Sequence, residues 1–402
     1  MTFSKEKRLS FFFIFVNIFY LTQGIVPALS IMYSVLLLFI FLISIIYIPK
    51  VHHLYGDSNF IKSLDIFVLL IGIYGVINLI QGADFQLRSM LPDYRPHTYL
   101  TNAFRPLLQL YPLYFFVRKG YINEDTIRFW VIPSMIAALV AFYVNDMTAE
   151  VSTADAGDVE RTSNIGYLIV SIFPLLFFLK KNLIKYLLLS LVVIMVFISA
   201  KRGAILIAGL STVWFLFFDL KKSTGKQKVT ILLLMCLAGT FLYRYLSEVF
   251  EESYYLNYLL EKTIAGDSSG RDVLYSRAWK QFEDGSLLNV IFGYGADSTY
   301  TILGNRAHND WLELLINQGI VGVLVYAILW FEIFRCWVKS KTNSNSLIFI
   351  VMGSIIIIFF MKTMFSMLYN DLSAIIAIPF AWCIASIDMK KTVLHRESHR
   401  DE

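Results

Sequence analysis

The sequence predicts an all-α membrane protein with about twelve transmembrane helices and one large external loop. Of its 402 residues, 57% are hydrophobic and only 16% are charged, which lies far outside the range of soluble globular chains. Apolar runs such as SIMYSVLLLFIFLISIIYI and SLIFIVMGSIIIIFF approach the roughly 20 residues that cross a bilayer. A backbone in lipid must satisfy its own hydrogen bonds, and these runs lack the alternation of a membrane barrel, so helices are expected.

Hydropathy divides the chain into four parts: helices 1–9 in residues 1–246, an external loop in 247–309, helices 10–12 in 310–388, and a basic tail in 389–402. The first apolar run follows a basic start, but no small-residue cleavage site comes after it, so it is interpreted as a retained span and not as a signal peptide. The expected spans are residues 9–26, 29–48, 63–82, 101–117, 128–146, 164–180, 183–200, 203–219, 229–246, 310–334, 347–368 and 371–388.

The distribution of basic residues predicts the orientation of these spans. Most of the 35 Lys and Arg residues fall on the side that the loops after even-numbered spans share with both termini. By the positive-inside rule this side is the cytoplasm, so both termini are expected there. Lysine predominates on that side, whereas arginine predominates on the outer side. Guanidinium groups bind phosphate with two parallel hydrogen bonds, so the outer arginines suggest a phosphorylated ligand, with pairing to outer acidic residues as the alternative.

Several cations lie at the outer ends of expected spans. The segment SAKRGAIL places Lys201 and Arg202 in a very short outer connection, against the inside bias. We interpret this pair as ligand-binding, although snorkelling to lipid headgroups is the competing explanation. Arg105 precedes Pro106, a residue favoured in the first turn of a helix, and is a second candidate. Arg244 and Lys362 are secondary candidates that snorkelling explains.

The external loop is far longer than a connection between packed helices requires. The segment AGDSSGRDVLYSRAWKQF predicts a short helix that Asp267 or Ser269 caps and that carries Arg271, Tyr275, Arg277 and Trp279. In NVIFGYGADSTY, two glycines predict a tight turn around Tyr294. Aromatic rings and arginines together suit sugars and phosphates, and an ordered lid packed by its own aromatic residues is the alternative.

The segment RAHNDWLELLINQGIVGV ends this loop and begins a span, so Arg306, His308 and Asn309 are expected at the outer membrane surface. Asp310 and Glu313 resemble a capping box, which predicts that they organise the helix start. Near the positive end of a helix, the imidazole of His308 is expected close to its neutral, proton-accepting form, as a general base requires. Gly319 and Gly322 are interpreted as close-packing positions.

The chain at this point resembles the bacterial O-antigen polymerases and O-antigen ligases. HNDWLELLINQGIVG looks like the family pattern of His-Asn, nine residues, Gly, two residues, Gly, carried here by His308, Asn309, Gly319 and Gly322. KRGA resembles the family's Ser-Arg-Gly element, with Lys201 in the place of Ser. FGYGADS resembles the family's Gly-aromatic-Gly turn upstream of the His. The resemblance covers roughly residues 165–335.

The resemblance implies transfer of a glycan from undecaprenyl diphosphate to an acceptor hydroxyl at the outer face of the bacterial inner membrane. His308 and Asn309 would be catalytic, with no cofactor and no metal. Membrane lipids and a chain-length regulator protein would be partners, and nucleic acid would not. The cationic and aromatic side chains would bind the diphosphate and glycan, namely Arg105, Lys201, Arg202, Arg271, Arg277, Tyr294 and Arg306.

The acceptor separates the two activities of the family. A polymerase adds to another carrier-linked repeat unit, and a ligase adds to the lipid A core. Ligases of this kind tend to place small hydroxyl residues after the second glycine, whereas this chain continues with VLVYA, so polymerase is favoured. A flippase or other transporter of lipid-linked oligosaccharides is a second alternative, although the two halves of the chain show no obvious repeat.

The remaining candidate residue types carry no site. Cys236, Cys336 and Cys383 show no metal or redox spacing and are expected to be packing residues. His97 is the only other histidine expected on the outer side. The others are interpreted as solvated loop residues on the cytoplasmic side, namely His52, His53, His395 and His399.

Overall fold

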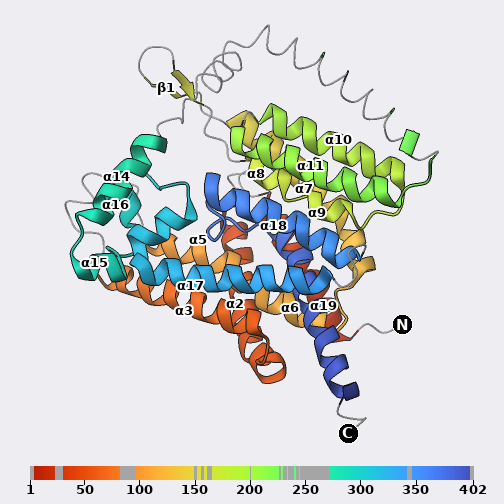
Figure 1. The fold of residues 1–402 in the computed structure, drawn as a ribbon, viewed down its shortest axis with the longest axis horizontal. Coiled ribbons are helices and arrows are strands. Elements are labelled where there is room, and N and C mark those ends of the chain that lie inside the picture. Colours follow the sequence, from red (N-terminus) through yellow and green to blue (C-terminus); the bar gives the residue numbers. More distant parts are fainter. Residues whose placement is uncertain are drawn as a thin grey trace.

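The fold is a bundle of helices capped at one end by a small group of shorter helices (Figure 1). It was obtained as a computed structural model. The structure describes residues 4–22, 30–81, 96–148, 152–154, 158–160, 165–199, 201–225, 228–229, 233, 240, 244, 271–341 and 346–398. Most of the expected ninth span and the first part of the external loop therefore lie outside the described residues.

Helices cover nearly all of the expected spans that the structure describes. In the first half of the chain they are α1 (Lys5–Tyr20), α2 (Ser30–Tyr55), α3 (Asn59–Gln81), α5 (Pro96–Leu108), α6 (Leu110–Arg118), α7 (Glu124–Thr148), α8 (Ile165–Val170) and α9 (Phe173–Leu176). In the second half they are α10 (Asn182–Ile198), α11 (Arg202–Lys222), α14 (Arg271–Glu283), α15 (Leu287–Phe292), α16 (Ser298–Leu303), α17 (Asp310–Ser340), α18 (Leu347–Phe365) and α19 (Ala374–Ser398).

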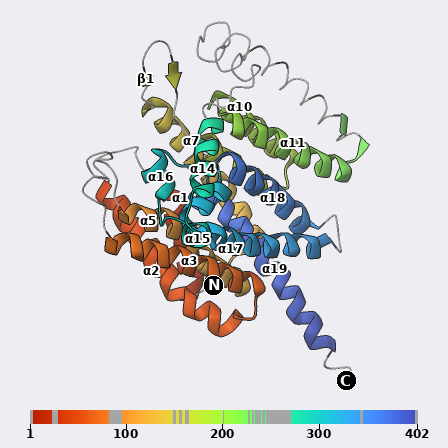
Figure 2. The ribbon, with the colours of Figure 1, turned by 60° about the vertical axis from the view of Figure 1, so that its left-hand side comes forward.

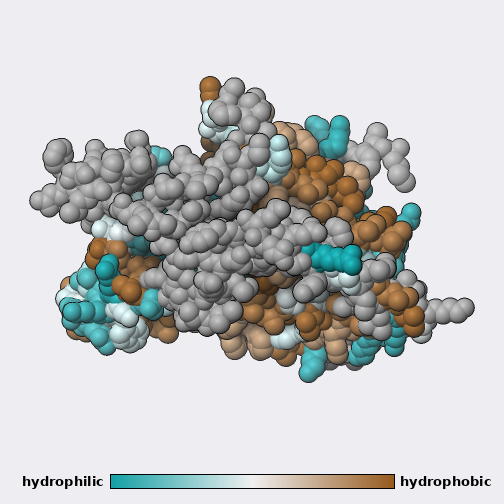
Figure 3. All heavy atoms as spheres, turned by 90° about the horizontal axis from the view of Figure 1, so that it is seen from above, coloured by the Kyte–Doolittle hydropathy of each residue, from teal (hydrophilic) through white to brown (hydrophobic). Residues whose placement is uncertain are grey.

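Six of the described helices are long and apolar enough to cross a bilayer: α2, α3, α7, α11, α17 and α18. Shorter apolar helices occupy Ile165–Leu176, Asn182–Ile198 and Ala374–Met389. Membrane character is thus confirmed in the described part of the chain, and the total of about twelve spans stays a prediction. In Figure 3, hydrophilic residues gather at the left-hand end, and hydrophobic residues predominate among the other described residues, with hydrophilic ones scattered toward the right.

Large aromatic side chains fill the interior of the bundle. Tyr47 of α2 packs edge-on against Phe115 and Phe116 of α6, with both ring centroids 4.9 Å away. Phe359 of α18 and Phe380 of α19 lie 5.1 Å apart in a similar geometry. These side chains are almost fully buried, so the core depends on complementary packing of bulky groups.

Polar contacts concentrate at the two ends of the bundle. The loop end holds α14, α15 and α16, the starts of α11 and α17, and the turn between α18 and α19 (Figures 1 and 2). At the opposite end, Lys50 lies 3.4 Å from Glu6, and Asp388 accepts hydrogen bonds from Ser58 and Tyr114. The hydrophobic middle separates these two polar regions, as a membrane requires.

The structure corrects details of the expected elements. The all-helical class is confirmed for the described residues, with one small addition: β1 (Ser152–Ala154) and β2 (Asp158–Glu160) pair as a short antiparallel hairpin in the connection after α7. Pro106 lies near the end of α5, which places Arg105 in the last turn of that helix and not in the first. Helix α19 continues to Ser398, well into the segment expected to be a basic tail.

Candidate active site at the start of helix α17

His308 occupies a strained position immediately before helix α17. Its φ angle is 51°, in the left-handed region that residues with a Cβ rarely adopt. The next residue, Asn309, is the N-cap, and its side-chain oxygen accepts hydrogen bonds from the backbone N–H groups of Trp311 and Leu312 at 3.0 and 3.2 Å. The expectation of a capping box formed by Asp310 and Glu313 is therefore wrong, because the cap lies one residue earlier.

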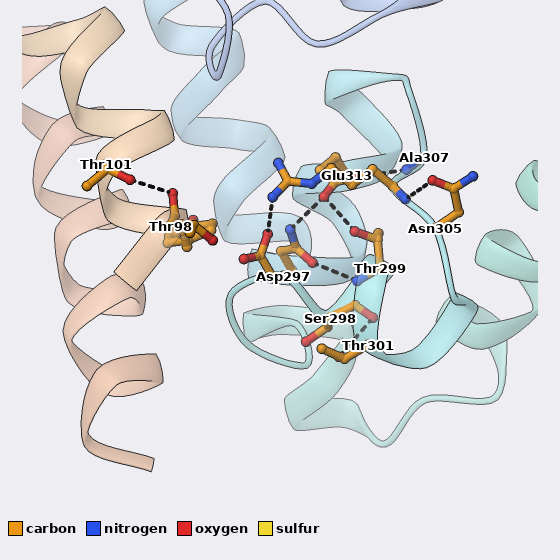
Figure 4. A network of polar contacts seen from close by, with 12 residues as sticks. Thr98, Thr101, Asp297, Ser298, Thr299, Thr301, Asn305, Ala307 and Glu313 are labelled. Atoms are coloured by element: carbon orange, nitrogen blue, oxygen red, sulfur yellow. Dashed lines mark hydrogen bonds and ion pairs between the residues drawn. The ribbon is translucent and has the colours of Figure 1, made fainter. Parts of the chain in front are cut away.

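Glu313 instead holds the loop that carries His308. Its carboxylate is fully buried and accepts hydrogen bonds from the Thr299 hydroxyl at 2.5 Å and from the Ala307 N–H at 2.8 Å. Asn317 donates a third at 3.3 Å and in turn accepts from the Thr299 N–H at 3.1 Å. Figure 4 shows Thr299 and Ala307 converging on this carboxylate. Because Ala307 precedes His308, the network fixes the backbone from which the imidazole projects.

Asp310 connects the same helix start to the turn between α18 and α19. It is fully buried, and it accepts a hydrogen bond from the Tyr326 hydroxyl at 2.7 Å. The Leu368 N–H donates to both of its carboxylate oxygens, at 3.0 and 3.1 Å. These contacts join residues 58 positions apart in the sequence. The two acidic residues after Asn309 thus support structure, as expected, although through partners other than those predicted.

Two glycines let the loop lie against a break in α17. Gly319 has φ 66° and interrupts the helix, while Gly293 has φ 77° and ends α15. A Cβ on Gly319 would meet the Ile291 carbonyl oxygen at 2.4 Å, so only glycine fits there. The Tyr294 and Gly295 N–H groups donate to the carbonyls of Ile316 and Asn317, which the break frees. Gly319 is therefore a close-approach position, as expected, and also a helix break, which was not expected.

Three cations lie near the His308 imidazole. Burial lowers the pKa of His308 below its ordinary value of 6.5, and the positive charges of Arg271, Lys201 and Arg306 lower the pKa further. The imidazole is consequently neutral at pH 7 and can accept a proton. These cations come from three separate segments, and the fold brings all three to one histidine.

The start of α11 supplies the first of these segments. Lys201 is its N-cap and Arg202 its first residue, and both side chains are partly exposed. A Cβ on Gly203 would meet the Tyr167 hydroxyl at 2.3 Å, so Gly203 allows α8 to approach. That hydroxyl donates to the Phe365 carbonyl at 3.0 Å and also interacts with the Arg271 side chain. Tyr167 therefore joins α8, α14 and the end of α18 beside the two cations of α11.

The loop supplies the other two segments. Arg271 is the first residue of α14, as the predicted short helix required, while its expected caps, Asp267 and Ser269, lie outside the described residues. Arg306 lies 3.2 Å from Asp297, whose side chain is 1% exposed. Asp297 has a φ of 56° at the start of α16, so this ion pair fastens α16 to the stretch that precedes His308.

Other predicted binding residues lie away from His308 or have structural partners. Arg105 packs over the Tyr20 ring at 5.0 Å, and Arg277 is exposed on α14. The Tyr294 hydroxyl donates to the Gln281 carbonyl at 2.7 Å and so braces the turn between α14 and α15. None of these three is among the groups whose charge acts on the described His308 imidazole.

The two secondary cations have different surroundings. Lys362 does not snorkel as expected, because its ammonium is buried and lies 2.7 Å from the Asp371 carboxylate. Arg244 is exposed, and most residues around it lie outside the described part of the chain.

Sequence reasoning missed Tyr167 and Asp297. Asp297 belongs to the quoted FGYGADS segment, so a carboxylate beside a glycine turn was a visible signal. Tyr167 had no comparable signal, since its contacts with Arg271 and Gly203 depend on the packing of α8. An open depression between α14 and α17, lined in part by Tyr275, Trp279 and Leu312, places aromatic side chains next to this region.

Comparison with known proteins covers the segment that contains most of these features. Residues 186–327 match a family model described as O-Antigen ligase. The match spans the start of α11, the loop helices and the first half of α17. A comparison with curated proteins gives no match.

Proposed function

We propose that this membrane protein joins carrier-linked glycans. The proposal starts from the match of residues 186–327 to the O-antigen ligase family model. The proposed donor is an oligosaccharide on undecaprenyl diphosphate, and the proposed acceptor is a second carrier-linked repeat unit. The family supports membrane glycan processing of the ligase and polymerase type, and the identity of the donor and acceptor is our proposal.

The observation that carries this proposal is the meeting of a neutral imidazole with cations from three segments. In the proposed step, an acceptor hydroxyl attacks the anomeric carbon of the donor sugar and passes its proton to a ring nitrogen of His308. The bond between that carbon and the diphosphate breaks, and its electron pair leaves with the diphosphate. Lys201 and Arg271, whose charges act on His308, and Arg202, which follows Lys201 at the start of α11, stabilise the charge that develops on this leaving group.

The neighbours of His308 have supporting roles in the proposal. Asn309 caps α17 with its side-chain oxygen, so it assists by fixing the position of the imidazole. Arg306 lies against Asp297, so we assign it to the electrostatics of His308 and to holding the loop. In this scheme cationic side chains neutralise the diphosphate, and activity is expected to persist after treatment with a metal chelator.

Polymerase is favoured over ligase by the residues after Gly322, which are VLVYA where ligases of this kind tend to carry small hydroxyl residues. Lipopolysaccharide from a deletion strain separates the two activities. A core carrying a single repeat unit supports polymerase, whereas bare core with accumulated carrier-linked polymer supports ligase.

A transporter of lipid-linked oligosaccharides is the second candidate, and turnover by purified protein separates it from an enzyme. Detergent-solubilised protein given carrier-linked repeat units should form longer glycans. Absence of new glycosidic bonds in folded, donor-binding protein would contradict the proposed activity.

We also propose that the loop end faces the outside of the inner membrane and that both termini face the cytoplasm. The basic residues of the opposite end, including Lys50, Arg118 and Lys185, support this orientation through the positive-inside rule. A reporter fused after residue 225 should read cytoplasmic, and one inserted near residue 265 should read external. A cytoplasmic reading at residue 265 would contradict the site assignment.

A further inference from the structure

We infer that helix α15 (Leu287–Phe292), which the sequence places in an external loop, is inserted among the lipid acyl chains of the bilayer. The inference concerns the membrane contact of the loop, and it does not depend on the transfer reaction. Four observations on α15 and its neighbours support it.

The first observation is the exposed apolar face of α15. Leu287 is 74% exposed, Leu288 is 68% exposed and Phe292 is 51% exposed. No residue of this helix is buried within the protein. A cluster of large side chains of this kind is costly in water and marks a surface that something apolar covers.

The second observation is the depth of α15 along the bundle. The Tyr74 hydroxyl of α3 donates a hydrogen bond to the Phe292 carbonyl. Tyr74 lies seven residues before the end of α3 at Gln81, or about 10 Å at the rise of an α-helix. On the other side, the Ile291 carbonyl lies against Gly319, the break in α17 after which its long apolar part begins. Helix α15 therefore lies against the terminal turns of α3 and the first turn of the long part of α17, at the left-hand end of the bundle in Figure 1.

The third observation is continuity with surfaces that lipid must cover. Helices α3 and α17 are both candidate spans. Near Tyr74, α3 exposes Ile73, Val76 and Ile77 at 43–50% and Ile80 at 80%. Near Gly319, α17 exposes Ile320 at 40% and Leu324 at 57%. Lipid acyl chains that cover these exposed side chains of α3 and α17 would also contact the neighbouring leucines of α15. We therefore infer that lipid, and not another protein, covers α15.

The fourth observation is that polar backbone groups at both ends of this segment have partners within the protein, which favours burial in hydrocarbon, where an unsatisfied polar group costs several kcal/mol. Ser286 caps the start of α15, and Tyr74 satisfies a carbonyl at its end. The non-helical residues that follow donate to α17, through the Tyr294 and Gly295 N–H groups. Glu283 and Asp284 are exposed just before the cap, where the chain would meet the headgroups.

A nitroxide attached to Leu288→Cys tests the inference in phospholipid vesicles that contain only this protein. Power saturation compares the collisions of the label with oxygen, which concentrates in lipid, and with a nickel chelate, which stays in water. Leu69→Cys on α3, where Leu69 is 64% exposed, is the lipid reference. Ser276→Cys on the exposed face of α14 is the water reference. Leu287→Cys repeats the measurement at a neighbouring position.

Each outcome decides the inference. Strong oxygen and weak nickel collisions at Leu288, as at Leu69, are expected. Nickel collisions as strong as at Ser276 would show that α15 lies in water, and weak collisions with both reagents would show that protein covers it, such as a second copy of this chain. Either of the last two results overturns the inference. Cys336 and Cys383 are buried, so the parent chain labelled under the same conditions supplies the background.

Discussion

The two ends of the bundle hold their cations next to different neighbours. At the opposite end, Lys50, Lys185 and Arg335 lie 3.4, 2.5 and 2.6 Å from the carboxylates of Glu6, Asp219 and Glu332. At the loop end, Arg306 and Lys362 also pair with carboxylates, those of Asp297 and Asp371, but Lys201, Arg271 and Arg306 in addition act together on the imidazole of His308. Pairing with carboxylates suits orientation and packing in a membrane, whereas positive charge around a neutral base suits an anionic ligand.

The largest effect is expected from His308→Ala. If His308 accepts the proton of the attacking hydroxyl, its loss should lower the transfer rate by roughly 10²–10⁴-fold while the carrier-linked donor still binds. His97→Ala is the matched control, since His97 is exposed at the start of α5 and should be dispensable. Full activity of folded His308→Ala would reduce the residue to a loop-shaping role.

A smaller loss is expected from Arg202→Lys, which keeps the charge but removes the paired N–H groups that suit phosphate. Loss of one charge-assisted hydrogen bond, about 1.5–3 kcal/mol, corresponds to roughly 10–100-fold in the rate of transfer. Arg118→Lys at the opposite end, where Arg118 packs over the Tyr55 ring at 4.5 Å, is the control and should change transfer little. Equal rates of transfer by Arg202→Lys and Arg118→Lys would contradict the claim that arginine at the loop end binds the diphosphate.

Glu313→Gln tests how the loop end holds the histidine. The carboxylate accepts from Ala307 at one oxygen and from Thr299 and Asn317 at the other, so an amide must turn its NH₂ toward one of these donors. We expect about 1–3 kcal/mol of destabilisation, measured by thermal unfolding in detergent. The loss of activity should fall on kcat more than on KM, because the base is displaced while the donor site remains. A change in stability alone, with normal kcat, would show that Glu313 does not position His308.

The smallest effect is expected at the opposite end from Asp125→Asn. Asp125 pairs with Arg128 one helical turn away, and its side chain is 79% exposed. Exposed ion pairs contribute at most about 1 kcal/mol, so transfer and thermal stability should both stay close to those of the parent. A loss as large as that of Glu313→Gln would contradict the division between the two ends.

The sequence predicts the apolar helices well because the bilayer imposes one length and one composition on each span. The apolar runs containing α2, α3, α17 and α18 were accordingly visible in the sequence. The β1–β2 hairpin and the division of the expected span 164–180 into α8 and α9 were not, because short elements depend on local turns and on neighbouring helices.

The site was predictable to the extent that motifs carry it. His308, Lys201, Arg202 and Arg306 were all recognised as residues in compact segments of sequence. Tyr167 was missed, since its relation to Arg271 exists only after α8 packs beside α11 and α14. The role of Glu313 was misassigned because a capping pattern and a tertiary carboxylate network use the same residue types at similar spacing.

The most direct test is the pH dependence of transfer by purified protein, compared between the parent and Lys201→Gln. The pKa of His308 is lowered partly by the charge of Lys201, so activity should fall only as pH drops below the lowered value. Removing that charge should raise the pKa of His308, so the fall in activity on the acid side of the pH profile should begin at a higher pH than in the parent. Lys180→Gln at the opposite end should leave this fall at the pH of the parent, with donor binding and folding measured across the same range. If the parent, Lys201→Gln and Lys180→Gln all lose activity at the same acidic pH, the account that cations of the loop end tune His308 as the base is contradicted.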